Sequence, residues 1–141
     1  MRQTKIILML FVTMAFLFGC GSSKQVVTID EMPEFPGGLG ELENYLTDNI
    51  HYPETALNAG VEGKVMVQFI VRADGSITDC AIYESLSKEC DEEALRVVRR
   101  MPKWKPGRNE GQPVDVGFLL PIRFKIPKQI EILRSGGRGE Y

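Results

Sequence analysis

The feature that most constrains the fold is an alternating apolar run near the C-terminus that contains a proline. Every second residue is apolar in this run, namely Val116, Phe118, Leu120, Ile122, Phe124 and Ile126. A period of two predicts a β-strand with one face toward a core. Pro121 has no N–H to donate, so it is accepted in a sheet only where that side of the backbone has no neighbour. We therefore expect residues 114–126 to form an edge strand, which a partner could extend.

A second apolar run predicts the strand at the centre of the sheet. Residues 64–72 carry apolar side chains at both odd and even positions, which makes this run the best candidate for a central strand. Asp74-Gly75 is a hairpin signal, and residues 76–83 form the predicted return strand. Pro102 to Gly111 is read as a loop that leads to the last strand.

Three helices are expected around these strands. The first carries Leu42, Tyr45, Leu46 and Ile50 at helical spacing, and Tyr52-Pro53 separates it from a short second helix that ends before Gly60. Residues 91–101 form the third, with Asp91 as its N-cap. The helix before the last strand allows that strand a parallel place beside the second strand or an antiparallel place beside the first. The two-faced apolar character of residues 64–72 favours putting that strand in the middle.

The N-terminus has the pattern of an export signal. Arg2 and Lys5 precede the apolar residues 6–18, and Gly19-Cys20 follows. Residues 17–20 resemble a bacterial lipobox, which predicts a signal peptide over residues 1–20 and lipidation of Cys20. Plain secretion and a retained membrane helix are the weaker alternatives, since the apolar run would span only about 20 Å.

A short tether and a tail are expected to flank the folded part. Residues 21–32 are polar and, fully extended, reach on the order of 40 Å, so the domain should stay close to its membrane. The predicted domain covers residues 33–126, and residues 127–141 read as a flexible tail. Cys80 and Cys90 remain after Cys20, and two alternatives stay open for them: a disulfide in an oxidising compartment, or two thiols in the core.

The sequence indicates no catalytic chemistry. His51 is the only histidine, the serines at 85 and 87 lie in a polar segment, and no hydrolase elbow, zinc motif or phosphate-binding loop is present. We expect no enzyme activity, no cofactor and no metal. A net charge of −2 with scattered basic residues indicates no nucleic-acid partner. Trp104, in a proline-rich segment, is expected to close one end of the core.

Several landmarks, taken in order, resemble the C-terminal domain of the TonB family of periplasmic energy transducers. They span residues 31–126 and comprise Tyr52-Pro53, Ala56, Gly60, Glu62-Gly63, the strand at 65–71, Asp74-Gly75, the helix at 91–101, Pro102, the segment 104–107 and the strand from Pro113 to Phe124. The preceding residues 32–38 look like the extension found before this domain in Bacteroidetes-type members. The resemblance implies a small α+β domain, a three-stranded antiparallel sheet with helices packed on one face.

The resemblance also implies a partner and a place for it. Such domains bind the N-terminal box peptide of an outer-membrane TonB-dependent transporter by β-strand addition to the last strand, in support of energy-dependent nutrient transport. The corresponding binding residues in this chain are Val114, Val116, Phe118, Leu119, Leu120, Pro121, Arg123 and Lys125.

The predicted anchor shapes the expected role. A lipid anchor and short tether in place of a membrane-spanning helix and proline-rich spacer predict a lipoprotein of the outer membrane that faces the periplasm and acts as an adaptor or competitor. The alternative is a structural or assembly lipoprotein of the cell envelope that forms homodimers, or holds a partner, through the same edge strand.

Overall fold

The computed structural model describes residues 28–130. The predicted signal peptide, its lipidation residue Cys20 and residues 131–141 of the predicted tail lie outside the described residues. Within residues 28–130, no helix has the length and apolar character needed to cross a membrane.

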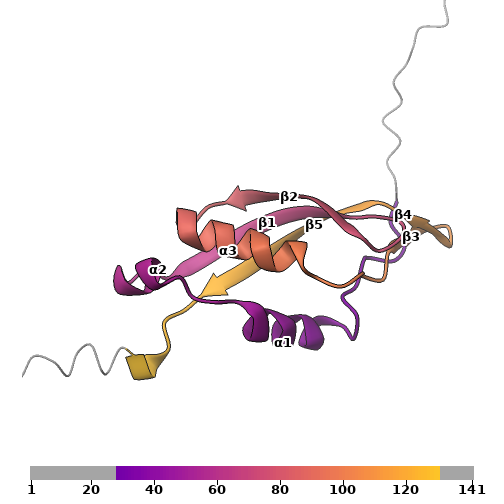
Figure 1. Ribbon diagram of the computed structural model, residues 1–141. Coiled ribbons are helices and arrows are strands. Elements are labelled where there is room, and N and C mark those ends of the chain that lie inside the picture. Colours follow the sequence, from indigo (N-terminus) through magenta and orange to yellow (C-terminus); the bar gives the residue numbers. More distant parts are fainter. Residues whose placement is uncertain (1–27, 131–141) are drawn as a thin grey trace, which may run out of the picture.

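The described chain is an α+β domain built on a three-stranded antiparallel sheet with the strand order β2-β1-β5. The helices lie on one face of this sheet (Figure 1). The elements, in chain order, are α1 (Leu39–Asn49), α2 (Glu54–Asn58), β1 (Gly63–Val71), β2 (Ile77–Glu84), α3 (Lys88–Arg99), β3 (Gly107–Asn109), β4 (Gln112–Val114) and β5 (Val116–Phe124). The predicted fold class, the central strand and the edge position of the proline strand are confirmed.

The two ladders of the sheet differ in regularity. β1 pairs with β5 without a register shift, from Gly63 opposite Phe124 to Val71 opposite Val116. β1 and β2 pair with two irregularities, and Asp79 within β2 has a left-handed φ of 54°. The proline-containing edge is therefore the straighter of the two, because bulges bend and twist a strand.

The core lies between the sheet and α3. β1 buries Val65, Val67, Phe69 and Val71, and α3 buries Cys90, Ala94, Val97 and Val98. Trp104 is also buried and packs against the rings of Phe35, Phe69 and Phe118, which confirms that it closes one end of the core. The buried residues of this cluster all fall between positions 35 and 124, so the described segment contains its own core.

The start of the third helix differs from the prediction. α3 begins at Lys88, and the Ser87 hydroxyl caps it by accepting a hydrogen bond from the Cys90 N–H at 3.2 Å. Asp91 is not the N-cap; it lies within the helix, where its carboxylate accepts hydrogen bonds from the Ser85 hydroxyl and the Leu86 N–H. The earlier cap places Cys90 inside the helix. The structure has Cys80 and Cys90 as free thiols rather than as a disulfide.

The predicted loop before the last strand contains a small hairpin. β3 and β4 pair through a turn in which Glu110 and Gly111 both have positive φ angles, 49° and 76°. Two such residues form a two-residue hairpin loop that matches the twist of the strands. As a result Val114 lies in β4, opposite Gly107, and β5 begins at Val116 instead of at the predicted residue 114.

The segment before α1 packs against this hairpin. The Asp30 N–H donates to the Arg108 carbonyl oxygen at 2.9 Å, and bridges join Glu31 to Arg108 and Glu34 to Lys105. The folded part therefore starts before the predicted boundary at Pro33.

Gly75 in the β1–β2 turn has no room for a side chain. Its φ is 87°, and a Cβ atom there would come within 2.2 Å of the Trp104 carbonyl oxygen. The Gly75 carbonyl oxygen accepts a hydrogen bond from the Trp104 N–H at 2.8 Å. The turn and the tryptophan segment are thus held together, backbone against backbone.

We predict that Gly75→Ala lowers the free energy of unfolding by about 2 kcal/mol or more, because it combines left-handed strain with a backbone clash. Gly111→Ala is the matched control: its φ is also positive but its Cβ would meet open space, so it should lose only about 1 kcal/mol. Urea unfolding of both variants measures the difference, and equal losses would contradict the clash.

Candidate functional site at the free edge of the sheet

The outer side of β5 is a free strand edge. β5 ends the sheet order, and within residues 28–130 no strand pairs with its outer side. The ladder with β1 runs unbroken through Pro121, opposite Met66. Since proline has no N–H, its missing donor must face outward, and the N–H and C=O groups of a strand alternate between its two edges. Gly117, Leu119 and Arg123 therefore present their backbone groups outward.

The predicted binding residues divide into two sets. Val116, Leu120 and their even-numbered neighbours are buried or half-buried against the core, so they can contribute backbone support but little side-chain contact. Leu119, Pro121, Arg123 and Lys125 are exposed. Val114 belongs to β4 and lies outside this edge.

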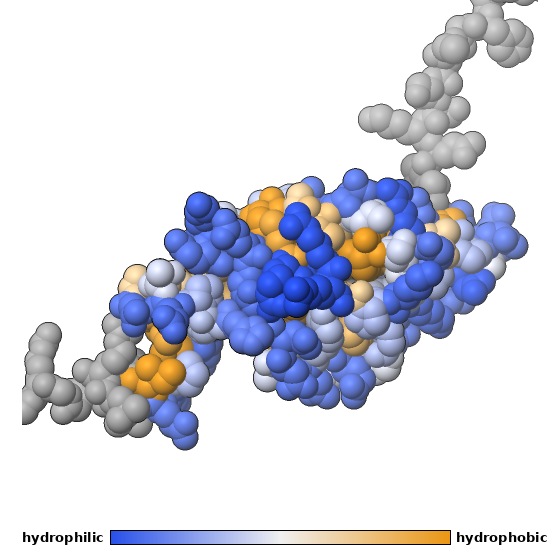
Figure 2. Space-filling model, viewed as in Figure 1, coloured by the Kyte–Doolittle hydropathy of each residue, from blue (hydrophilic) through white to orange (hydrophobic). Residues whose placement is uncertain are grey.

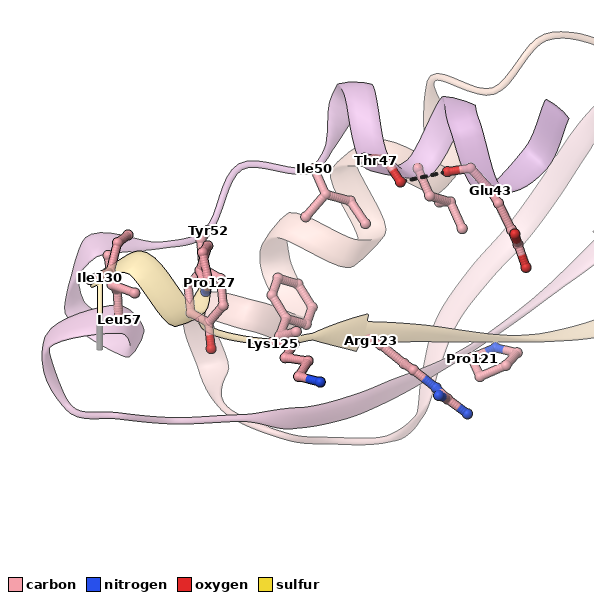
Figure 3. Close-up of a pocket in the computed structure, with 12 residues that line it drawn as sticks. Glu43, Thr47, Ile50, Tyr52, Leu57, Pro121, Arg123, Lys125, Pro127 and Ile130 are labelled. Atoms are coloured by element: carbon pink, nitrogen blue, oxygen red, sulfur yellow. Dashed lines mark hydrogen bonds between the residues drawn. The ribbon is translucent and has the colours of Figure 1, made fainter. Parts of the chain in front are cut away.

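A groove of about 820 Å³ runs beside the C-terminal half of this edge. Figure 3 shows α1 along one wall, with Glu43, Thr47 and Ile50, and the end of β5 along the other. Arg123 and Lys125 extend from the β5 ribbon away from α1. This volume lies within the range of peptide- and ligand-sized pockets. Figure 2 shows an orange, hydrophobic patch at the same end of the domain, close to the last described residues.

Sequence reasoning missed the helical wall and floor of this groove. Its lining includes Leu46, Ile50, Tyr52, Leu57, Pro127 and Ile130 in addition to residues of β5. The signal was present in the predicted helix: of its apolar stripe only Leu42 is fully buried, while the others are half-buried. An apolar stripe wider than the core requires is what a groove wall needs. Pro127 and Ile130 were assigned to the flexible tail.

The end of the groove is fixed by contacts around Tyr52. Its ring packs edge-on against Phe124 with the ring centroids 5.6 Å apart, and its hydroxyl donates to the Val61 carbonyl oxygen. Burial is the main reason that the pKa of Tyr52 is raised. The Ile126 N–H donates to the Glu62 carboxylate at 2.6 Å, which holds the chain as it leaves β5.

A polar cluster on α3 holds the C-terminal end of α1. Arg96 donates to the Asn49 carbonyl oxygen at 2.7 Å and to Glu93, and Glu93 accepts the His51 N–H at 2.7 Å. Burial raises the pKa of Glu93, but hydrogen bonds from Arg96 and His51, with their charges, outweigh it, so that the pKa is lowered overall. His51 is exposed and belongs to this tie between helices; its ring contacts Arg96 and Glu93 rather than a nucleophile.

A second cluster fixes the other end of β5. Arg72, just after β1, donates to Asp115 at 2.8 Å, to Asp79 at 2.7 Å and to the Thr78 hydroxyl. Asp115 also accepts the Ala73 N–H at 2.8 Å. The hydrogen bonds from Arg72 and Ala73, aided by the charge of Arg72, lower the pKa of Asp115. One arginine thus joins all three strands where β5 begins.

The opposite edge of the sheet, on β2, is less suited to a partner strand. Its ladder is irregular and Asp79 interrupts it with a left-handed backbone. Bulges and charges of this kind are how natural sheets protect their edges. Of the two edges, β5 is the one that remains straight and open. Among residues 28–130, no group of three or more His, Cys, Asp or Glu residues could hold a metal ion.

The model of the family described as Gram-negative bacterial TonB protein C-terminal matches residues 48–126. Protein TonB of Helicobacter pylori strain J99 is 27% identical over 89 residues, which are 62% of this chain and 30% of that protein. Protein TonB of Vibrio cholerae is 33% identical over 76 residues, 53% of this chain and 31% of that protein. The chain thus spans about a third of the length of the curated relatives it matches.

Two solved domains are also similar. The solution structure of residues 194–285 of Helicobacter pylori TonB has a TM-score of 0.46 and 25% identity, and it covers 61% of this chain and 90% of that chain. The Pseudomonas aeruginosa TonB C-terminal domain has a TM-score of 0.43 and 28% identity, and it covers 54% of this chain and 77% of that chain.

We predict that Asp115→Asn destabilises the protein at neutral pH and that this difference disappears in acid. Because the folded pKa of Asp115 lies below its ordinary 3.8, its charge stabilises the fold fully above pH 3.8, and the stabilisation is lost as the pH falls through the folded value. Unfolding curves of both proteins across this range measure it. Asp48→Asn, at an exposed carboxyl of α1, is the control, and a difference for Asp115→Asn that persists unchanged in acid would contradict the ion pair as its source.

Proposed function

Since this chain belongs to the family of C-terminal domains of the Gram-negative bacterial TonB protein, we propose that it is a non-enzymatic module of the periplasm. Its function is to bind the N-terminal box peptide of outer-membrane TonB-dependent transporters, in support of energy-dependent nutrient transport. The peptide adds as a new strand to the outer edge of β5.

The observation that carries this proposal is the unbroken ladder through Pro121. A proline that leaves its ladder intact has its missing donor on the outside, so the remaining outward groups of β5 are free for a partner. The straight β1–β5 register supplies a regular row of these groups. Main-chain hydrogen bonds to this row provide affinity for any extended peptide.

The same proline divides the edge into two segments. Gly117 and Leu119 offer donors on one side of the gap, and Arg123 offers one on the other. The groove between α1 and β5 adjoins only the second segment. A bound peptide therefore pairs with backbone along both segments, and its side chains near Arg123 enter the groove, where selectivity arises.

Attachment to a membrane is part of the proposal. The supporting pattern is the basic and apolar start of the sequence followed by Gly19-Cys20, together with the short stretch of residues 21–29 before Asp30 joins the hairpin. A lipid on Cys20 would hold the domain within a few tens of ångströms of the bilayer. Such a protein acts as an adaptor or competitor at transporters of the same membrane. Mass spectrometry of the protein from its native envelope tests the acylation of Cys20.

We predict that Leu119→Pro weakens peptide binding while the fold is retained. The substitution removes an outward N–H and places a ring against the added strand. The fold should be retained because Pro121, which also faces outward, leaves the β1 ladder intact. Affinity should fall roughly tenfold or more. A fluorescence titration of residues 28–130 with transporter N-terminal peptides measures this.

Two controls accompany that titration. Leu119→Ala keeps the N–H and should retain most of the affinity. Leu120→Pro places the missing N–H toward β1 and should unfold the sheet instead. If no transporter peptide binds the wild type at millimolar concentration, or if Leu119→Pro binds as well as Leu119→Ala, strand addition to β5 is overturned.

We also predict that Arg123→Glu lowers the affinity for peptides that carry a carboxylate near the groove. Arg123 is exposed and makes no ion pair with another described residue, so its charge is available to a ligand. The loss should be a few-fold at low salt and should shrink as salt screens the exposed charges. Titrations at two salt concentrations measure it, with Lys103→Glu, at an exposed lysine of the Trp104 segment, as the control. A loss that is independent of salt would point to a structural effect.

A further inference from the structure

We propose that the uncovered face of the sheet is a contact surface for a second copy of this chain. This inference goes beyond peptide binding at the edge of β5 and does not depend on it. The open face, as we name this surface, carries the side chains of Met66, Gln68, Ile70, Thr78, Ala81, Tyr83, Glu84, Leu119 and Pro121, with Gly117 contributing bare backbone.

The open face has apolar residues at its centre, with polar ones among them and toward its ends, and it is not covered within the described residues. The helices lie on the opposite side of the sheet (Figure 1). Tyr83 is 67% exposed and Leu119 is 43% exposed, which makes them two of the large hydrophobic residues that the fold leaves in water. Exposed apolar groups that gather on one face mark contact sites more often than isolated ones.

The open face also contains a hollow that suits a large side chain. A cavity of about 450 Å³ is lined by Gln68, Ile70, Asp79, Tyr83, Gly117 and Leu119, with the backbone of the sheet beneath. It exists because Gly117 has no side chain: a Cβ atom there would meet nothing within 4 Å. A hollow and the exposed Tyr83 ring therefore stand side by side on one surface. A two-fold pair needs that combination, since each copy must offer both the projection and the recess.

The charges at the two ends of the open face are opposite in sign. At one end Lys64 lies directly opposite Arg123, and Lys64 has only a 3.9 Å contact with Glu84. At the other end one cation, Arg72, is shared by Asp79 and Asp115. Two basic side chains directly opposite each other are unfavourable within a single sheet. When two copies stack with their strands antiparallel, the basic end of each meets the acidic end of the other.

The centre of the open face is self-complementary as well. Gln68 lies between Ala81 on β2 and Leu119 on β5. It is exposed, and its amide makes no hydrogen bond to another described side chain. An amide has both donors and an acceptor, so two copies of Gln68 can pair across a two-fold axis.

The small area of this contact limits the affinity between the two copies. Three strands about 4.8 Å apart, each some 27 Å long, give a face of roughly 400 Å² per copy. Such an interface falls below the size of stable dimers, so the pair is weak and forms only when the local concentration is high. This weakness distinguishes it from an obligate dimer.

The test is sedimentation velocity of residues 28–130 over concentrations from about 10 μM to about 1 mM, the range of a weak interface. The wild type should show a concentration-dependent shift from monomer to dimer, and high salt should reduce it. Gly117→Leu fills the hollow and should keep the protein monomeric. Its φ lies outside the left-handed region and Leu suits a strand better than Gly, so a folding failure is not expected; thermal unfolding checks this. Tyr83→Ser should also be monomeric.

The edge of β5 is the competing explanation for a dimer, and the variants separate the two. Pairing of two β5 edges would be lost in Leu119→Pro but retained in Leu119→Ala and in Gly117→Leu. Contact through the open face would be weakened similarly in both Leu119 variants and lost in Gly117→Leu. A wild type that stays monomeric at the highest concentration, or a folded Gly117→Leu that dimerises as the wild type does, overturns the proposal.

Discussion

The antiparallel ladder between β1 and β5 is the interaction on which the rest of the structure depends. It buries the even-numbered side chains of β5 against β1 and α3, and it does so without a register shift over its whole length. The ladder tolerates Pro121 only because the missing N–H faces away from β1. The same constraint that preserves the core therefore fixes which backbone groups of β5 remain unpaired.

The contacts at the two ends of β5 convert this strand into a defined edge. Arg72 and Asp115 hold its beginning to β1 and β2, and Tyr52 and Glu62 hold the chain where it leaves the sheet. Arg96 holds the last turn of α1, which carries groove residues, by donating to the Asn49 carbonyl oxygen. The edge is thus preorganised, which reduces the entropy lost when a flexible peptide binds.

The sequence allowed the sheet to be predicted more fully than the site. Alternation, the two-faced apolar character of residues 64–72 and Pro121 together favoured the observed strand order, because they reflect local burial and a missing donor. The start of α3 was misplaced, since Ser87 and Asp91 both suit a cap and only packing decides between them. The hairpin of β3 and β4 was missed because its turn uses Glu110, a residue that rarely adopts positive φ. The α1 wall of the groove was missed because helical spacing predicts an apolar stripe but not which part of that stripe the core leaves uncovered.

One strand can carry two separate surfaces because its backbone groups alternate between the two edges with the same period of two residues with which its side chains alternate between the two faces. In β5 the odd-numbered residues direct their backbone groups to the outer edge and their side chains to the open face. An added strand would use the first set of groups and a stacked sheet the second. A peptide on the edge would widen the sheet from three strands to four and so enlarge the open face by about a third. Occupation of the edge would therefore strengthen, rather than block, contact between two copies.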